Sequence, residues 1–88
     1  MNTEFMLMAQ YNGLAIIPVH LICRDYFTHL TVEKFLRKAL AGAINIPVVR
    51  IEGSQKSAKG VHVADFAAYL DLRADAARKE CEQLRPTA

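Results

Sequence analysis

The hydrophobic positions of the chain form two matching stripes in its first half. Apolar residues recur at i, i+3, i+4, i+7 and i+8 over residues 19–27 and again over 32–40, and this spacing places them along one side of a helix. Pro18 suits the start of the first helix, Thr31 the N-cap of the second, and Gly42 its C-terminal stop. The pattern predicts two helices joined by residues 28–31, with apolar stripes made of Val19, Ile22, Cys23, Tyr26 and Phe27, then Val32, Phe35, Leu36, Ala39 and Leu40.

A β-hairpin is predicted over residues 48–63. In the segment 48–52, Val49 and Ile51 lie on one side of a strand and their neighbours on the other. The short apolar segment 61–63 forms the returning strand. A polar loop bounded by two glycines, residues 53–60, separates the strands and gives the hairpin a basic tip.

A long helix is predicted from residues 64–65 to Leu84. Asp65 lies in its first turn, where a negative charge is favourable. Seven residues then alternate in steps of four and three, the narrow seam of a coiled coil: Val63, Ala67, Leu70, Ala74, Ala77, Cys81 and Leu84. The seam packs either along the domain's own core or against a second copy. We expect a homodimer or larger assembly with residues 73–88 as an oligomerisation extension, through Ala67, Leu70, Ala74, Ala77, Cys81 and Leu84.

The N-terminal segment, residues 4–17, allows two interpretations. An apolar run precedes Asn12-Gly13, and a second apolar run follows it. Asn-Gly is a preferred pair in tight hairpin turns, so we expect a β-hairpin. The alternative is a short helix from Asn2 or Thr3, because the methionines, leucine and alanine of this segment favour helices.

The order helix, short turn, helix, strand, loop, strand is that of a helix-turn-helix with a wing. The sequence therefore predicts an α+β fold: a small winged helix-turn-helix domain with an N-terminal β-hairpin and a long C-terminal helix, as one domain over residues 1–88. An α-helix fits the major groove of DNA. We expect contacts to double-stranded DNA from Thr31, Lys34, Arg37, Lys38, Arg50, Ser54, Gln55, Lys56, Ser57 and Lys59. Of these, Arg37 is expected to read bases, and Lys34, Lys38, Lys56 and Lys59 to meet phosphates.

The charge distribution supports this interpretation. The chain has 88 residues and a formal net charge of only +2. Its positive charge is concentrated in residues 34–59, where six bases are opposed by Glu52 alone. A concentrated basic segment is typical of nucleic-acid binding. A solvated basic face on a plain packing module, or on a protein-interaction module with an acidic partner, is the alternative that the residues alone leave open.

Composition excludes several other classes of protein. No apolar run is long enough to span a membrane, and no basic run precedes an apolar N-terminal segment, so no membrane or secretory signal is expected. The two cysteines favour a reducing cytoplasm. A zinc site from His20, Cys23 and His29, with Cys81 or His62, is disfavoured because Cys23 lies on an apolar stripe. No motif pairs a nucleophile with a base, so we expect no enzyme, no metal and no cofactor.

Three stretches resemble a known family: MNTEFMLMAQYNG, YFTHLTVEKFLRKALAG and IPVVRIEGSQKSAKGVHVADFAAYLD. They are similar to the pyocin activator protein family over about residues 1–72, and the segment 50–71 is the most specific part. The order of elements is also similar to excisionase-type winged helices. The resemblance implies a phage-derived transcription activator that binds promoter DNA of a phage-tail-like bacteriocin or prophage cluster, with RNA polymerase as a candidate partner. An excisionase-like architectural protein that bends DNA is the alternative.

Overall fold

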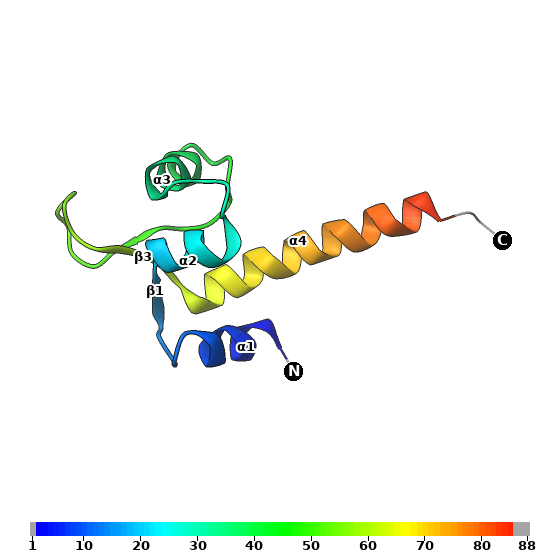
Figure 1. Cartoon of the computed structure of the whole chain (residues 1–88), viewed down its shortest axis with the longest axis horizontal. Helices are drawn as coiled ribbons and strands as arrows, with labels where there is room; N and C mark the ends of the chain where they lie inside the picture. The colour runs from blue at the N-terminus through cyan, green and yellow to red at the C-terminus, as the bar shows by residue number, and fades with distance from the viewer. Residues whose placement is uncertain (1, 86–88) are drawn as a thin grey trace.

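The computed structural model describes residues 2–85. In that range it contains four helices and a three-stranded antiparallel sheet (Figure 1). The elements are α1 (Thr3–Gln10), β1 (Ile16–Pro18), α2 (Val19–Tyr26), α3 (Val32–Leu40), β2 (Val49–Arg50), β3 (Lys59–His62) and α4 (Val63–Leu84). The arrangement confirms the expected α+β class, with a winged-helix-like order and a long C-terminal helix. Within the described residues, no helix has the length and apolar content to cross a membrane.

The two predicted helices are present, but their stripes are buried unequally. In α2 most of the stripe is buried, and the ring of the exposed Tyr26 still meets Phe66 edge-on at 5.0 Å between centroids. In α3 only Phe35 is fully buried, against the ring of Phe27 at 5.0 Å. Leu40, expected in the stripe, is 74% exposed. The reason is that α3 is nine residues long and only its middle rests on the core.

The sheet has the order β1-β3-β2, so β3 is its central strand. The predicted hairpin is present with shifted bounds: its first strand shrinks to Val49–Arg50, and its return begins earlier, at Lys59. Gly60 pairs with Pro18 on one side and with Val49 on the other. A Cβ added there would lie 2.5 Å from Cγ2 of Ile16 and 2.8 Å from the carbonyl oxygen of Ile17. The close approach of β1 therefore requires glycine at this position.

The N-terminal segment corrects our expectation of a hairpin, because residues 3–10 form helix α1. The side chain of Asn2 caps it by accepting a hydrogen bond from the amide of Phe5 at 2.8 Å. Asn12 and Gly13 do adopt the positive φ angles, 56° and 76°, that the turn pattern indicated. The following strand, however, pairs with β3 and not with residues 5–9. The predicted turn at Asn12-Gly13 is therefore confirmed, whereas the strand that pairs with β1 is a distant one.

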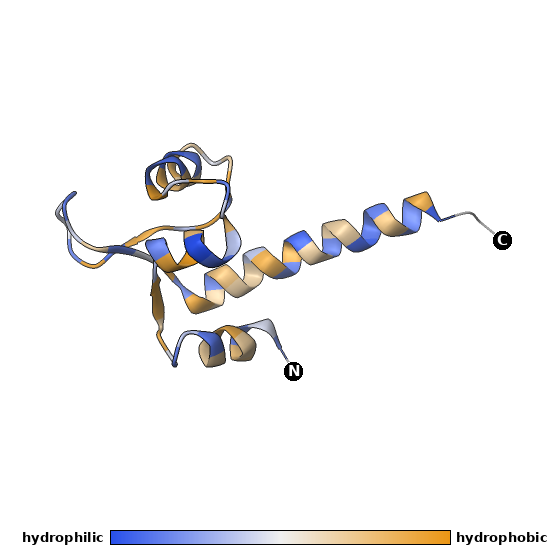
Figure 2. Cartoon of the chain, viewed as in Figure 1, coloured by the Kyte–Doolittle hydropathy of each residue, from blue (hydrophilic) through white to orange (hydrophobic). Residues whose placement is uncertain are grey.

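The core lies between the sheet and helices α1, α2, α3 and α4 (Figure 2). Its largest fully buried side chains are Leu7, Ile17, Ile22, Phe35, Val61 and Phe66. Helix α1 lies beside α4, and the hydroxyl of Thr3 donates a 2.5 Å hydrogen bond to Asp71. The first turns of α4 are buried, whereas its last turns project well beyond the rest of the molecule (Figure 1). As a result, the described residues extend 57 Å along their longest axis.

Candidate nucleic-acid interface

Helix α3 is fixed at both ends by its own sequence. The side chain of Thr31 accepts a hydrogen bond from the amide of Lys34 at 3.1 Å, the predicted N-cap. At the other end Gly42 has a φ of 80°. The amide of Ala43 donates to the carbonyl of Lys38 at 2.9 Å, and the amide of Gly42 to that of Ala39 at 3.2 Å. These two bonds form a Schellman motif, so the length of α3 is defined by local chemistry.

The exposed side of α3 is cationic. Phe35 turns toward the core, and Lys34, Arg37 and Lys38 are all exposed. The ion pairs found within residues 2–85 join Arg24 to Asp25 and Arg78 to Asp75, so no carboxylate there neutralises these three charges. The helix thus presents three uncompensated cations to solvent.

A groove lies between α3 and the β2–β3 hairpin, which we call the wing. It has a volume of about 380 Å³ and is lined by Leu36, Leu40, Val48, Arg50 and Lys59. A second hollow brings Val32 and Leu36 of α3 close to Ser57, Ala58 and Lys59 of the wing. The two predicted contact segments therefore lie next to each other, and Leu36 and Leu40 of α3 share the groove with Arg50 and Lys59 of the wing. We call α3 and the wing together the cationic face.

Several wing residues hold the loop in shape. Oγ of Ser54 accepts from the amide of Lys56 at 3.1 Å, and Oγ of Ser57 donates to the carbonyl of Glu52 at 3.0 Å. The ammonium of Lys59 donates to the carbonyl of Gln55 at 2.7 Å. These groups stabilise the wing and are less free to contact a ligand than sequence alone suggested. By contrast, the side chains of Gln55 and Lys56 are exposed at the tip.

The seam of α4 divides into two parts. Ala67 is buried in the domain's own core and Leu70 packs partly against it, so this part of the seam lies along the core, the first of the two expected arrangements. The stretch beyond them is free of the core. Ala77, Cys81 and Leu84 are exposed, and with Glu80 and Arg85 they line a shallow hollow of about 480 Å³.

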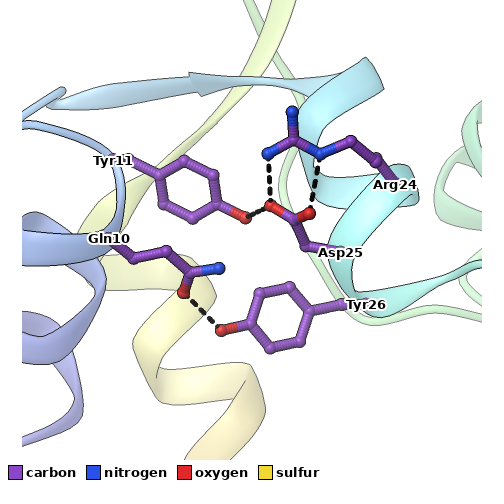
Figure 3. Close-up of polar contacts among 5 residues, drawn as sticks. All are labelled: Gln10, Tyr11, Arg24, Asp25 and Tyr26. Carbon is purple, nitrogen blue, oxygen red and sulfur yellow. Dashed lines mark hydrogen bonds and ion pairs between the residues drawn. The ribbon is translucent and has the colours of Figure 1, made fainter.

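On the side of α2 that faces α1, a hydrogen-bonded cluster connects the two helices (Figure 3). The hydroxyl of Tyr11 donates to Oδ2 of Asp25 at 2.7 Å, and the guanidinium of Arg24 binds both oxygens of the same carboxylate. Burial, together with the bond to Asp25, raises the pKa of Tyr11 well above its ordinary value. The bonds from Arg24 and Tyr11 lower the pKa of Asp25. A parallel bond joins the hydroxyl of Tyr26 to Gln10. The cluster fixes α1 against α2.

The residues considered for zinc lie apart. Cys23 is buried and Cys81 is exposed on α4, and Nδ1 of His62 accepts a hydrogen bond from the amide of Ala64 to cap α4. Within residues 2–85, no three His, Cys, Asp or Glu side chains gather in a way that would hold a metal ion.

In a comparison with known protein families, the model described as Pyocin activator protein PrtN matches residues 3–77. The match covers most of the chain. The chain belongs to the pyocin activator protein family. This membership supports a role in activating transcription of pyocin genes. The family is one of transcription activators and not of enzymes. Searches of curated proteins and of solved structures gave no significant match.

The pyocin activator match includes α1, the whole cationic face and α4 as far as Ala77. It therefore extends five residues beyond the 1–72 that the resemblance covered. The structure also identifies two features that the sequence did not single out. Glu33 is an exposed carboxylate within α3, and Leu40 is an exposed apolar side chain at its end. The apolar stripe had placed Leu40 on the buried side, whereas the position of Glu33 opposite Phe35 was available from helical periodicity.

Proposed function

We propose that this pyocin activator family member binds double-stranded DNA through the cationic face and activates transcription from it. One observation carries the proposal: buried Phe35 anchors α3 so that Lys34, Arg37 and Lys38 are exposed beside a wing that adds Arg50 and Lys56. An α-helix of this size enters the major groove. Exposed cations without ion-pair partners are suited to phosphate contacts.

Within this proposal the cations have different roles. Arg37 lies on the side of α3 away from Phe35, and its planar guanidinium pairs with the O6 and N7 atoms of guanine. Lys34 and Lys38 lie together on one side of it and contact phosphates, and Lys56 contacts the backbone from the wing. The ammonium of Lys59 is held by wing carbonyls, so its contribution to DNA binding is largely through the shape of the wing.

A salt titration of DNA binding tests the proposal. Lys56→Ala is expected to weaken binding to all sequences and to reduce the slope of log K against log salt by about one unit. Lys79→Ala is the matched control, because Lys79 is an exposed lysine on α4 away from the cationic face. Absence of duplex binding by the unaltered chain at low salt contradicts the proposal. Equal slopes for both variants and the unaltered chain contradict the role of Lys56.

We also propose that the free part of the α4 seam joins two copies of the chain. Leu84 is 84% exposed, and Ala77 and Cys81 lie beside it on the same hollow. Small residues allow two helices to approach closely, and two copies would double the number of DNA half-sites read. Sedimentation tests this: Leu84→Lys is expected to shift the mass toward the monomer. A monomeric unaltered chain at high micromolar concentration contradicts it.

A further inference from the structure

Glu33 is the exception to the positive charge of helix α3. It is the only carboxylate in α3, it is exposed, and the helix is otherwise cationic on its exposed side. The ion pairs within residues 2–85 involve neither Glu33 nor Arg37, although residues four apart on a helix are neighbours. Both side chains are therefore available to an external partner.

The geometry of α3 places these two side chains at its outermost positions. Glu33 precedes the buried Phe35 by two residues, and Arg37 follows it by two. At 100° per residue, each side chain therefore lies about 160° around the helix axis from Phe35. Lys34 and Lys38 lie to one side of the line that joins Glu33 and Arg37 along the helix. Leu36 and Leu40 lie to the other side, toward the wing. A duplex approached by the exposed side of α3 meets Glu33 and Arg37 first.

A carboxylate in this place has a narrow choice of partners on DNA. It only accepts hydrogen bonds, so phosphates, guanine O6 and N7, and thymine O4 all repel it. Cytosine presents its N4 amino group in the major groove and is the usual partner of Glu and Asp there. Adenine also carries an amino group, but its N7 acceptor lies beside it. Cytosine is therefore the base that best accommodates Glu33.

We infer that Glu33 is a specificity-determining residue that selects cytosine within about one base-pair step of the guanine read by Arg37. The inference rests on the proposed DNA binding and deepens it. Glu33 also lies in the first turn of α3, where its charge favours the helix. That stabilising role leaves base preference unchanged, and this difference separates the two roles in an experiment.

The test is selection of binding sites from a duplex library with a randomised centre, by the full-length chain and by two variants. Glu33→Gln removes the charge and keeps the shape. Glu82→Gln is the matched control, because it removes one exposed carboxylate from α4, away from the cationic face. Circular dichroism establishes that each variant is folded, and Glu33→Asp serves as a second α3 variant that keeps the charge on a shorter arm.

The unaltered chain is expected to select a site with a cytosine close to a preferred guanine. Glu33→Gln is expected to keep the guanine and to lose cytosine preference at that one position by about fivefold or more, the lower range for one base contact. It should also bind random duplex more tightly, since a repulsive charge is gone. Glu82→Gln should select the same site as the unaltered chain, and Glu33→Asp should weaken the cytosine preference.

Two results overturn the inference, and they are distinguishable. If the unaltered chain selects a site and Glu33→Gln selects the identical site with the same cytosine preference, Glu33 does not read a base although DNA binding stands. If the unaltered chain binds no duplex, the proposed function fails and the inference fails with it.

Discussion

The hydroxyl of Tyr11 donates a 2.7 Å hydrogen bond to Oδ2 of Asp25 and so ties the end of α1 to the last turn of α2. Tyr11 is buried, and the guanidinium of Arg24 donates to both oxygens of the same carboxylate. Helix α2 leads directly into the turn before α3. The cluster therefore helps to set the frame on which the cationic face is built, although it lies outside that face.

We predict that Tyr11→Phe lowers the free energy of unfolding by about 1 kcal/mol, the net value of a typical hydrogen bond. The phenyl ring keeps its packing, so the loss reflects the bond to Asp25. Denaturant unfolding measures it. Tyr26→Phe is the control, since the hydroxyl of Tyr26 bonds Gln10 in an exposed position, and its loss should be smaller. Equal effects of the two variants contradict this prediction.

The lowered pKa of Asp25 predicts that the free energy of unfolding depends on pH in the acid range. Its pKa is lowered in the folded protein by bonds from Arg24 and Tyr11, so the unfolded chain binds a proton first as the pH falls. The stabilisation is therefore present above the unfolded pKa of about 3.9 and is lost as the pH falls through the folded pKa. Unfolding free energies measured against pH should show the unaltered chain converging with Asp25→Asn in this range. A constant difference between the two down to strongly acid pH is incompatible with the mechanism.

Gly60→Ala is predicted to be strongly destabilising. The added Cβ would lie 2.5 Å from Cγ2 of Ile16 and 2.8 Å from the backbone oxygen of Ile17. A backbone atom that belongs to a hydrogen-bonded strand does not move freely. Thermal unfolding measures the loss. Gly53→Ala is the control, because open space surrounds that position in the wing, and it should unfold near the temperature of the unaltered chain. An unchanged melting temperature for Gly60→Ala refutes the close approach of β1.

Thr31→Ala is predicted to cost about 1 kcal/mol of stability, the typical value of a lost N-cap. Thr31→Ser keeps a hydroxyl that accepts from the amide of Lys34 and should restore most of it. Denaturant unfolding distinguishes the two. Because α3 is one of the two parts of the cationic face, the alanine variant should also bind duplex DNA more weakly. Equal stability of both variants means that the cap contributes nothing measurable.

A chain that ends at Ala77 is predicted to unfold, at low protein concentration, with nearly the free energy of the full chain. Of the residues removed, 78–85 are described by the structure; they are exposed and none of them belongs to the core. Denaturant unfolding at low micromolar concentration measures this, and circular dichroism should show a loss of helix in proportion to the deletion. A drop of several kcal/mol would mean that the end of α4 supports the body of the domain.

Local patterns in the sequence were sufficient to predict helices α2 and α3, the wing and α4. Each depends on spacing, caps and turn residues that act over a few positions, such as Thr31 and Gly42. The N-terminal hairpin was wrong for a different reason. The Asn12-Gly13 turn is local, whereas the choice of β3 as the partner of β1 depends on residues far along the chain, as does the helix that residues 3–10 then form against α4.

For the candidate site, too, the sequence predicts the features that depend on local pattern and not those that depend on tertiary packing. The cations of α3 and the wing could be named from the sequence, because charge and exposure follow periodicity. The groove between the two segments depends on tertiary packing, as do the exposure of Leu40 and the engagement of Lys59 with wing carbonyls. The division of the α4 seam at Leu70 depends on how far α1 and α2 extend along that helix, which no local pattern encodes.

The unequal surroundings of the two thiols give the unmodified protein a practical use. Cys23 is buried, and burial raises its pKa, whereas Cys81 is exposed near the end of α4. A maleimide dye added to the native chain should therefore attach to Cys81 and leave Cys23 unmodified, and pairing of two copies through the α4 seam should slow that attachment. The rate of labelling measured against protein concentration would then follow this pairing without engineering a new attachment point.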